Sequence, residues 1–112
     1  MIHVQPFTID GRLVQGISVS LPKTTLLIIT GASGYIMCGA LDVGLLNDKL
    51  ADRDVRAGKA VGVRTLEDLL HAPLAEVTVG AEKIGVHPGM SGIDALKKWL
   101  DVKNKPLIPM GF

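Results

Sequence analysis

The chain has 112 residues and a mass of 11.9 kDa, which is the size of one domain. Hydrophobic residues make up 47% of it and charged residues 21%, a balance that excludes an intrinsically disordered chain. A net charge of +1 and an aromatic content of 4% provide neither the basic surface nor the stacking rings of a nucleic-acid-binding protein. We therefore expect no nucleic-acid partner.

The cysteine count and the apolar runs set the expected compartment. The single cysteine permits no internal disulfide and no CxxC zinc pair. The first residues lack a basic segment followed by an apolar one, and Leu26–Ile29 is far shorter than the ~20 residues that cross a membrane. We expect a cytoplasmic protein with no membrane partner.

The N-terminal part of the chain predicts strands. Asp10-Gly11 separates the first two and is a strong hairpin signal, because both turn positions need a positive φ. The glycine-rich turn Gly31–Gly34 precedes the last. The predicted strands are His3–Ile9, Leu13–Leu21, Thr25–Thr30 and Tyr35–Cys38.

From Gly39 onward the apolar residues recur with helical spacing. A helix carries Leu41, Leu45, Leu46 and Leu50 on one face, and a short fifth strand, Gly58–Val63, follows. Three Ser or Thr residues are typical helix caps. They predict a helix from Thr65 to about His71, a short one from Thr78 to Gly85 and another from Ser91, although Glu76–Val79 is equally compatible with a strand.

This element order predicts one α+β domain over residues 1–100, followed by a C-terminal tail over 101–112. Short turns between strands indicate antiparallel pairing, whereas the strand–helix–strand unit from Tyr35 to Val63 indicates a right-handed parallel crossover. We expect a mixed, mainly antiparallel sheet of about five strands with helices on one face.

One motif resembles a dinucleotide-binding turn. Thr30-Gly31-Ala32-Ser33-Gly34 follows an apolar strand as in the T-G-x-x-G-x-x-G pattern, but Met37 occupies the place of the third glycine. The segment Tyr35–Cys38 is typical of a strand where that fold needs a helix. His3, His71 and His87 are scattered and have no metal-ligand spacing. We expect no cofactor and no metal.

A different resemblance covers residues 5 to 100. The segments that carry it are Gly34–Val43 with Leu45-Leu46-Asn47, then Gly58–Thr65, Leu69–Leu74 and Gly89–Gly92. They resemble the YunC-like family of small bacterial and archaeal proteins, which is catalogued as a domain of unknown function. The resemblance implies a fold and a single-domain identity, and it carries over no catalytic residue.

Candidate site residues lie at two strand–helix junctions, 38–42 and 62–65. If the fourth and fifth strands are parallel neighbours, both junctions meet at one sheet edge, where ligands commonly bind in open α/β sheets. Cys38, Asp42, Arg64 and Thr65 would line that crevice, and Gly39 would allow close backbone approach. Arg64 and two helix N-termini would suit an anion.

Each candidate also has a structural interpretation. A free cysteine usually packs as a small hydrophobe, and a first-turn carboxylate such as Asp42 stabilises its own helix. Arg64 has the alternative of a surface or ion-pairing side chain, and Thr65 suffices as a cap.

Trp99 lies on the apolar face of its helix and is expected to pack in the core, with an interface anchor as the alternative. A largely apolar tail favours a homo-oligomer through Leu107, Ile108, Met110 and Phe112. Three functions stay open: a homo-oligomeric domain that binds a small molecule or anion, an enzyme with Cys38 as nucleophile or redox centre assisted by Asp42, and a structural adaptor.

Overall fold

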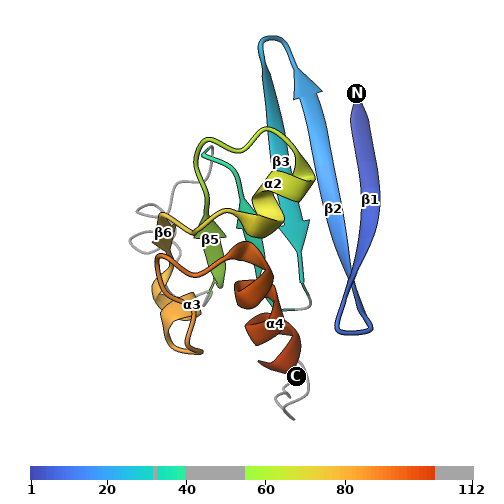
Figure 1. Cartoon of the computed structure of the whole chain (residues 1–112). Coiled ribbons are helices and arrows are strands. Elements are labelled where there is room, and N and C mark those ends of the chain that lie inside the picture. The colour runs from blue at the N-terminus through green and yellow to red at the C-terminus, as the bar shows by residue number, and fades with distance from the viewer. Residues whose placement is uncertain (32, 40–54, 103–112) are drawn as a thin grey trace.

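A computed structural model describes residues 1–31, 33–39 and 55–102, and Figure 1 shows their arrangement. One six-stranded sheet has the order β1-β2-β3-β4-β5-β6, with every neighbouring pair antiparallel except the parallel pair β4–β5. The strands are β1 (Ile2–Ile9), β2 (Arg12–Leu21), β3 (Thr24–Thr30), β4 (Tyr35–Met37), β5 (Ala57–Lys59) and β6 (Glu76–Val77). The expected α+β class with a mixed, mainly antiparallel sheet is confirmed, with one strand more than expected.

The helices of the described residues are α2 (Leu66–His71), α3 (Val79–Glu82) and α4 (Gly92–Val102). Helices α2 and α4 pack against each other, α2 over β2 and β3 and α4 over β4 (Figure 1). We call the sheet face that they cover the inner face and the opposite one the outer face. None of the helices in the described ranges is long and apolar enough to cross a membrane.

The predicted Asp10-Gly11 turn is confirmed. Asp10 has a φ of 52° and Gly11 a φ of 77°, so two residues connect β1 to β2 and pair Ile9 with Arg12. The β2–β3 turn has the same requirement at Lys23, whose φ is 65°. Because both turns are tight, β1, β2 and β3 form a continuous antiparallel meander.

The expected parallel pairing of these two strands is also confirmed, since β4 pairs with β5 in parallel and places Ile36 opposite Gly58. The helix expected over 41–50 lies outside the described residues. The fifth strand is shorter than the predicted Gly58–Val63 and covers Ala57–Lys59, because Gly62 adopts a φ of 75° and turns the chain out of the extended conformation. Residues 60–64 therefore separate β5 from α2.

Both predictions made around residue 78 are correct in part. Glu76–Val77 forms the short strand β6, and Thr78 then caps α3 with a side chain that is 1% exposed. The Thr78 hydroxyl accepts hydrogen bonds from the Ala57 and Ala81 N–H groups at 3.1 and 3.2 Å and donates to the Val55 carbonyl at 2.6 Å. One buried hydroxyl thus joins α3 to the chain around the start of β5.

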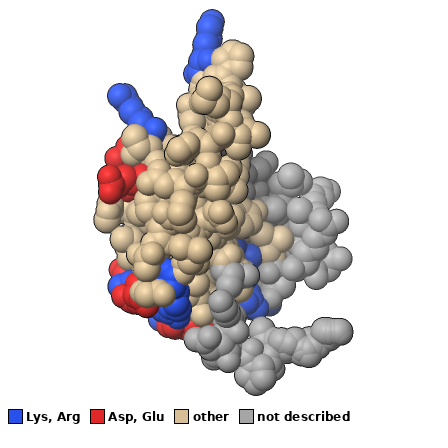
Figure 2. All heavy atoms as spheres, turned by 90° about the vertical axis from the view of Figure 1, so that its right-hand side faces the viewer, with Lys and Arg blue, Asp and Glu red and all other residues tan. Residues whose placement is uncertain are grey.

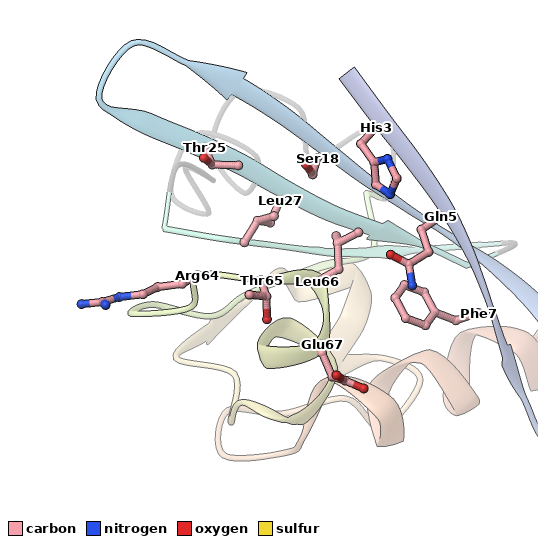
Figure 3. Close-up of a pocket in the computed structure, with 10 residues that line it drawn as sticks. All are labelled: His3, Gln5, Phe7, Ser18, Thr25, Leu27, Arg64, Thr65, Leu66 and Glu67. Carbon is pink, nitrogen blue, oxygen red and sulfur yellow. The ribbon is translucent and has the colours of Figure 1, made fainter. Parts of the chain in front are cut away.

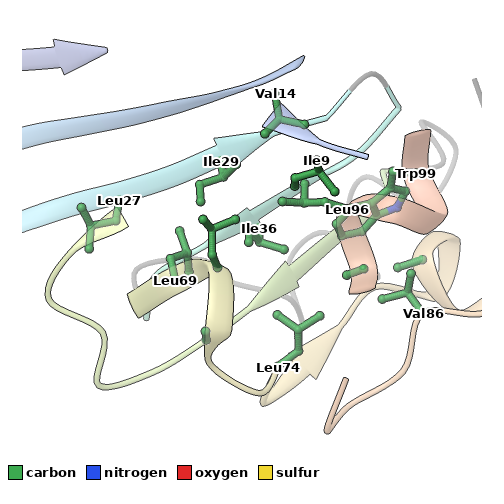
Figure 4. Packing of buried hydrophobic residues seen from close by; sticks show 14 of the residues in the cluster. Ile9, Val14, Leu27, Ile29, Ile36, Leu69, Leu74, Val86, Leu96 and Trp99 are labelled. Carbon is green, nitrogen blue, oxygen red and sulfur yellow. The ribbon is translucent and has the colours of Figure 1, made fainter. Parts of the chain in front are cut away.

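The core lies between the inner face and the helices, as Figure 4 shows. Inward-facing strand residues meet side chains of α2 and α4, and Trp99 of α4 is fully buried. Gly92, the first residue of α4, is the point of closest approach: a Cβ there would lie 2.4 Å from the Leu69 carbonyl oxygen and 2.7 Å from the Ile36 side chain. The labelled members of the cluster are Ile9, Val14, Leu27, Ile29, Ile36, Leu69, Leu74, Val86, Leu96 and Trp99.

The Gly92 contact generates a stability prediction. Gly92→Ala should lower the free energy of unfolding by about 1–3 kcal/mol, because the added methyl meets a backbone carbonyl that cannot move alone. Gly39→Ala is the matched control, since among the described residues its Cβ would meet only the Val61 side chain, at 3.7 Å. Urea unfolding of both variants measures the difference. Equal stability of the two variants would contradict the packing described here.

Candidate functional site

Helix α2 begins with a complete capping arrangement. The Thr65 hydroxyl accepts the Asp68 N–H at 3.0 Å, and the Asp68 carboxylate accepts the Arg64 N–H at 3.1 Å. These two bonds satisfy backbone donors that a helix N-terminus otherwise leaves open. The capping role expected of Thr65 is therefore confirmed, and the cap fixes how the chain before α2 approaches the sheet.

An open cavity of about 410 Å³ lies between the start of α2 and the inner face of the meander (Figure 3). Its volume is within the range of small-molecule sites. We call it the α2–sheet cavity. The lining residues are His3, Gln5 and Phe7 from β1, Ser18 from β2, Thr25 and Leu27 from β3, and Arg64, Thr65, Leu66 and Glu67 around the start of α2.

Strand register explains why these side chains converge. Side chains alternate between the two faces of a strand, so His3, Gln5 and Phe7 share the inner face. Ser18 lies directly opposite His3 on one side and Leu27 on the other. The meander extends beyond the helical layer at this end, as Figure 1 shows, and the cavity occupies the space beside the first turn of α2.

Arg64 and Thr65, two of the predicted ligand-binding residues, both line the α2–sheet cavity. The Arg64 side chain is exposed and extends away from the cluster of polar side chains in Figure 3. Glu67 lies on the same rim, one helical turn further on. The structure therefore combines one cation, one carboxylate and a helix cap at the mouth of the cavity.

Cys38 occupies a different environment from Arg64 and Thr65. Its side chain is 8% exposed and belongs to the hydrophobic core, and its Sγ accepts the Leu27 N–H at 3.4 Å. Gly39, by contrast, is exposed. Neither is among the described residues that line the cavity, and Asp42 lies outside the described part of the chain. The two strand–helix junctions were expected to line one crevice. Of the described candidates, only Arg64 and Thr65 line the cavity.

Eight of the ten lining residues were not among the candidates, and four of these eight are uncharged and polar: His3, Gln5, Ser18 and Thr25. A signal for them does exist in the sequence, because polar His3 and Gln5 alternate with apolar Ile2 and Val4 in the first strand. That alternation predicts a polar face on β1. It does not predict that α2 begins above that face, which depends on the three-dimensional path of residues 60–64.

The described residues contain no group of three or more His, Cys, Asp or Glu side chains placed to hold a metal ion. The cavity instead presents hydroxyl, amide and imidazole groups beside apolar side chains. What the arrangement can do chemically is bind: its side chains supply hydrogen-bond donors and acceptors beside an apolar floor of Phe7, Leu27 and Leu66.

The fold and cavity define a small single-sheet α+β protein, and comparison with known proteins gives its family. Residues 37–99 match the family described as "Domain of unknown function (DUF1805)". The chain is 50% identical over 100 residues to the "Uncharacterized protein YunC" of Bacillus subtilis (strain 168), covering 89% of this chain and 99% of that protein. The chain therefore belongs to this YunC-like family of uncharacterised proteins, as the sequence motifs indicated.

A solved structure supports the same fold. The crystal structure of TA1206 from Thermoplasma acidophilum, a protein of unknown function, superposes with a TM-score of 0.79 at 31% sequence identity. The match covers 88% of this chain and 93% of that one. The shared architecture is therefore that of nearly the whole molecule.

The position of Cys38 generates a prediction about its reactivity. Iodoacetamide should alkylate the folded protein at least about tenfold more slowly than the urea-unfolded chain, because the thiol is buried and hydrogen-bonded to the backbone. Mass spectrometry of timed samples measures both rates, with glutathione as the free-thiol control. Alkylation of the folded protein faster than that of glutathione would instead support the cysteine-dependent enzyme.

Proposed function

We propose that this protein is a cytoplasmic, homo-oligomeric domain that binds a small molecule in the α2–sheet cavity. The observation that carries the proposal is the cavity itself, which combines an apolar floor with polar side chains from three strands and from the start of α2. Arg64 and Thr65, the ligand-binding residues predicted from the sequence, both line this cavity. A single unpaired cysteine is consistent with a reducing cytoplasm.

The outer face of the meander supports self-association. By alternation, its residues are Ile2, Val4, Pro6 and Thr8 of β1, Leu13, Gln15, Ile17, Val19 and Leu21 of β2, and Thr24, Leu26, Ile28 and Thr30 of β3. None carries a charge, and several are exposed, including Leu13 at 68% and Ile2 at 69%. In Figure 2, which looks toward the β1 edge, most of the charged side chains lie at the top, at the upper left and at the lower left of the view, and most of the other described atoms are tan. An exposed apolar patch of this kind marks an interaction surface.

A second copy of the chain is the partner that fits this face. Two uncharged faces stack without repulsion or unpaired charge, and two sheets can pack at a spacing of about 10 Å. The edge of β1 is a poorer route to association. The hydrogen bonds between Met1 and Ser20 show that the N–H groups of the odd-numbered residues of β1 point toward β2. The N–H groups of the even-numbered residues therefore point to the free edge, and Pro6 has no N–H to donate there.

The size of the outer face predicts a weak dimer. Three strands of about eight residues present a face of about 26 by 14 Å, or roughly 400 Å² per copy. Two copies then bury roughly 800 Å², less than the ~1,200 Å² of stable complexes. We expect association in the micromolar range or above.

Val4→Glu should abolish self-association, because it places an unpaired carboxylate on the uncharged face, beside Ile17 of β2. Val79→Glu is the matched control, since Val4 and Val79 are both 50% exposed but Val79 lies on α3. Sedimentation equilibrium from micromolar to sub-millimolar concentration measures the average mass. We expect the mass to rise above 11.9 kDa for the wild type and for Val79→Glu only. A wild type that sediments as a monomer at every concentration would refute the homo-oligomer.

The other two functions have less support. A catalytic thiol must reach its substrate, and Cys38 is covered by core side chains. An adaptor role would use the outer face, but it leaves the α2–sheet cavity without a purpose.

Ligand binding is tested by filling the cavity. In ¹H–¹⁵N spectra, inorganic phosphate, citrate, benzamide and uridine are added in turn, and at least one should shift the amide signals of Thr25 and Thr65. Ser18→Phe should abolish that shift by occupying the cavity, whereas Gln15→Phe, on the outer face of the same strand and outside the lining, should leave it unchanged. No localised shift with any of the four compounds would refute the binding proposal.

A further inference from the structure

The formal charges around the α2–sheet cavity do not favour an anion. Among the described lining residues Arg64 is the only cation and Glu67 contributes a carboxylate, so their formal charges sum to zero. Asp68 adds a second carboxylate one residue further on, next to the cap. Phosphates and carboxylates are typically held by converging cationic groups, whereas Arg64 extends away from the other lining side chains in Figure 3.

Uncharged hydrogen-bonding groups dominate the wall of the cavity. His3, Gln5, Ser18 and Thr25 come from three adjacent strands, and none of their side chains has a hydrogen-bond partner within the described part of the protein. Each of these side chains can donate and accept. The Thr65 hydroxyl accepts the Asp68 N–H and keeps its own proton to donate. This combination matches ligand hydroxyl groups, which also donate and accept at the same atom.

The floor of the cavity is apolar and includes one aromatic ring. Leu27 is 2% exposed and Leu66 7% exposed, so both present a fixed surface, and Phe7 is half-buried beside them. Against such a floor a ligand ring can pack flat while its substituents reach the polar wall. Register places His3, Ser18 and Leu27 in one row across the three strands, with Thr25 and Gln5 one row to either side. A compact ring with several polar substituents therefore fits better than a single charged group.

From this arrangement we infer that the α2–sheet cavity takes an uncharged, hydroxyl-bearing ring compound, a sugar or a nucleoside, in preference to its phosphorylated form. The inference rests on the proposed function and gives its ligand a chemical class. Ser18 and Thr25 bind ligand hydroxyl groups, Phe7 packs against the ring, and Glu67 discriminates against an added phosphate by repulsion.

The inference is tested by isothermal titration calorimetry and ¹H–¹⁵N NMR spectra with four compounds: ribose, uridine, uridine 5′-monophosphate and inorganic phosphate. Uridine should bind at least about fivefold more tightly than its monophosphate and should shift the amide signals of Ser18, Thr25 and Thr65. Ribose that binds as tightly as uridine identifies the ligand as a sugar, and a preference of tenfold or more for uridine identifies it as a nucleoside.

Two pairs of variants separate the effect of a cavity side chain on binding from a general effect of substitution on the fold. Glu67→Gln should strengthen binding of the monophosphate severalfold and leave uridine unchanged, whereas Glu82→Gln, on the exposed surface of α3, should change neither. Ser18→Ala should weaken uridine binding severalfold, and Ser20→Ala should have no effect.

Two outcomes overturn the inference. If the monophosphate or inorganic phosphate binds more tightly than uridine, the class is wrong but the binding function stands. If uridine and ribose give no shift while citrate or benzamide does, the ligand class is again wrong and the binding function again stands. In addition to these two outcomes, failure of every compound to bind refutes the inference and the proposed function together.

Discussion

Close packing of large side chains against glycines holds the helical layer to the sheet. A Cβ at Gly34 would lie 2.5 Å from the Trp99 ring, and one at Gly58 would lie 2.7 Å from the Leu74 side chain. Gly16 makes a similar space for Phe7 and Leu66 on β2. Since each glycine receives an apolar side chain from another part of the chain, the distance between sheet and helices follows from these contacts. The α2–sheet cavity lies beyond Gly16, where the meander continues past the helical layer.

How far the sequence predicts this fold depends on whether a signal is local. The Asp10-Gly11 turn and the caps at Thr65 and Ser91 depend on neighbouring residues, and all three are confirmed. The boundary of β5 depends on more distant groups. The N–H of its first residue, Ala57, donates to the hydroxyl of Thr78, which is distant in the sequence. The apolar pattern does not contain this contact and therefore predicts a strand shifted toward Val63. Strand β6, likewise, is only two residues long.

The candidate site divides in the same way. Arg64 and Thr65 are adjacent to a helix cap, which local residues specify, and both line the cavity. The polar residues of the cavity wall come from three strands, so finding them requires the register of β1, β2 and β3 and the position of α2 above them. Cys38 lies in a segment that the sequence predicts as a strand, but the sequence alone does not tell which face of the sheet its side chain occupies. The inner-face position follows from the hydrogen bonds between Cys38 and Leu27, and this pairing cannot be predicted from the sequence.

The two faces of the meander differ in chemistry because successive side chains point in opposite directions. The outer face is uncharged, and Tyr35 and Met37 continue it on β4. Burial raises the pKa of the Tyr35 phenol above its ordinary value, so this hydroxyl stays neutral at physiological pH. The inner face of the same strands carries the polar wall of the cavity. Self-association and ligand binding can therefore use the same three strands without competing for surface.

The order of the elements along the chain also has a consequence for synthesis on the ribosome. Strands β1, β2 and β3 are joined by tight turns and can pair within microseconds once they emerge. The helices that cover Leu27 and Ile29 are encoded tens of residues later, and translation adds roughly 5–20 residues per second. For some seconds the nascent meander has its strands paired with one another but is bare on both faces and along the outer edges of β1 and β3. That interval, rather than any state of the finished protein, is when this chain is most exposed to aggregation and most dependent on chaperones.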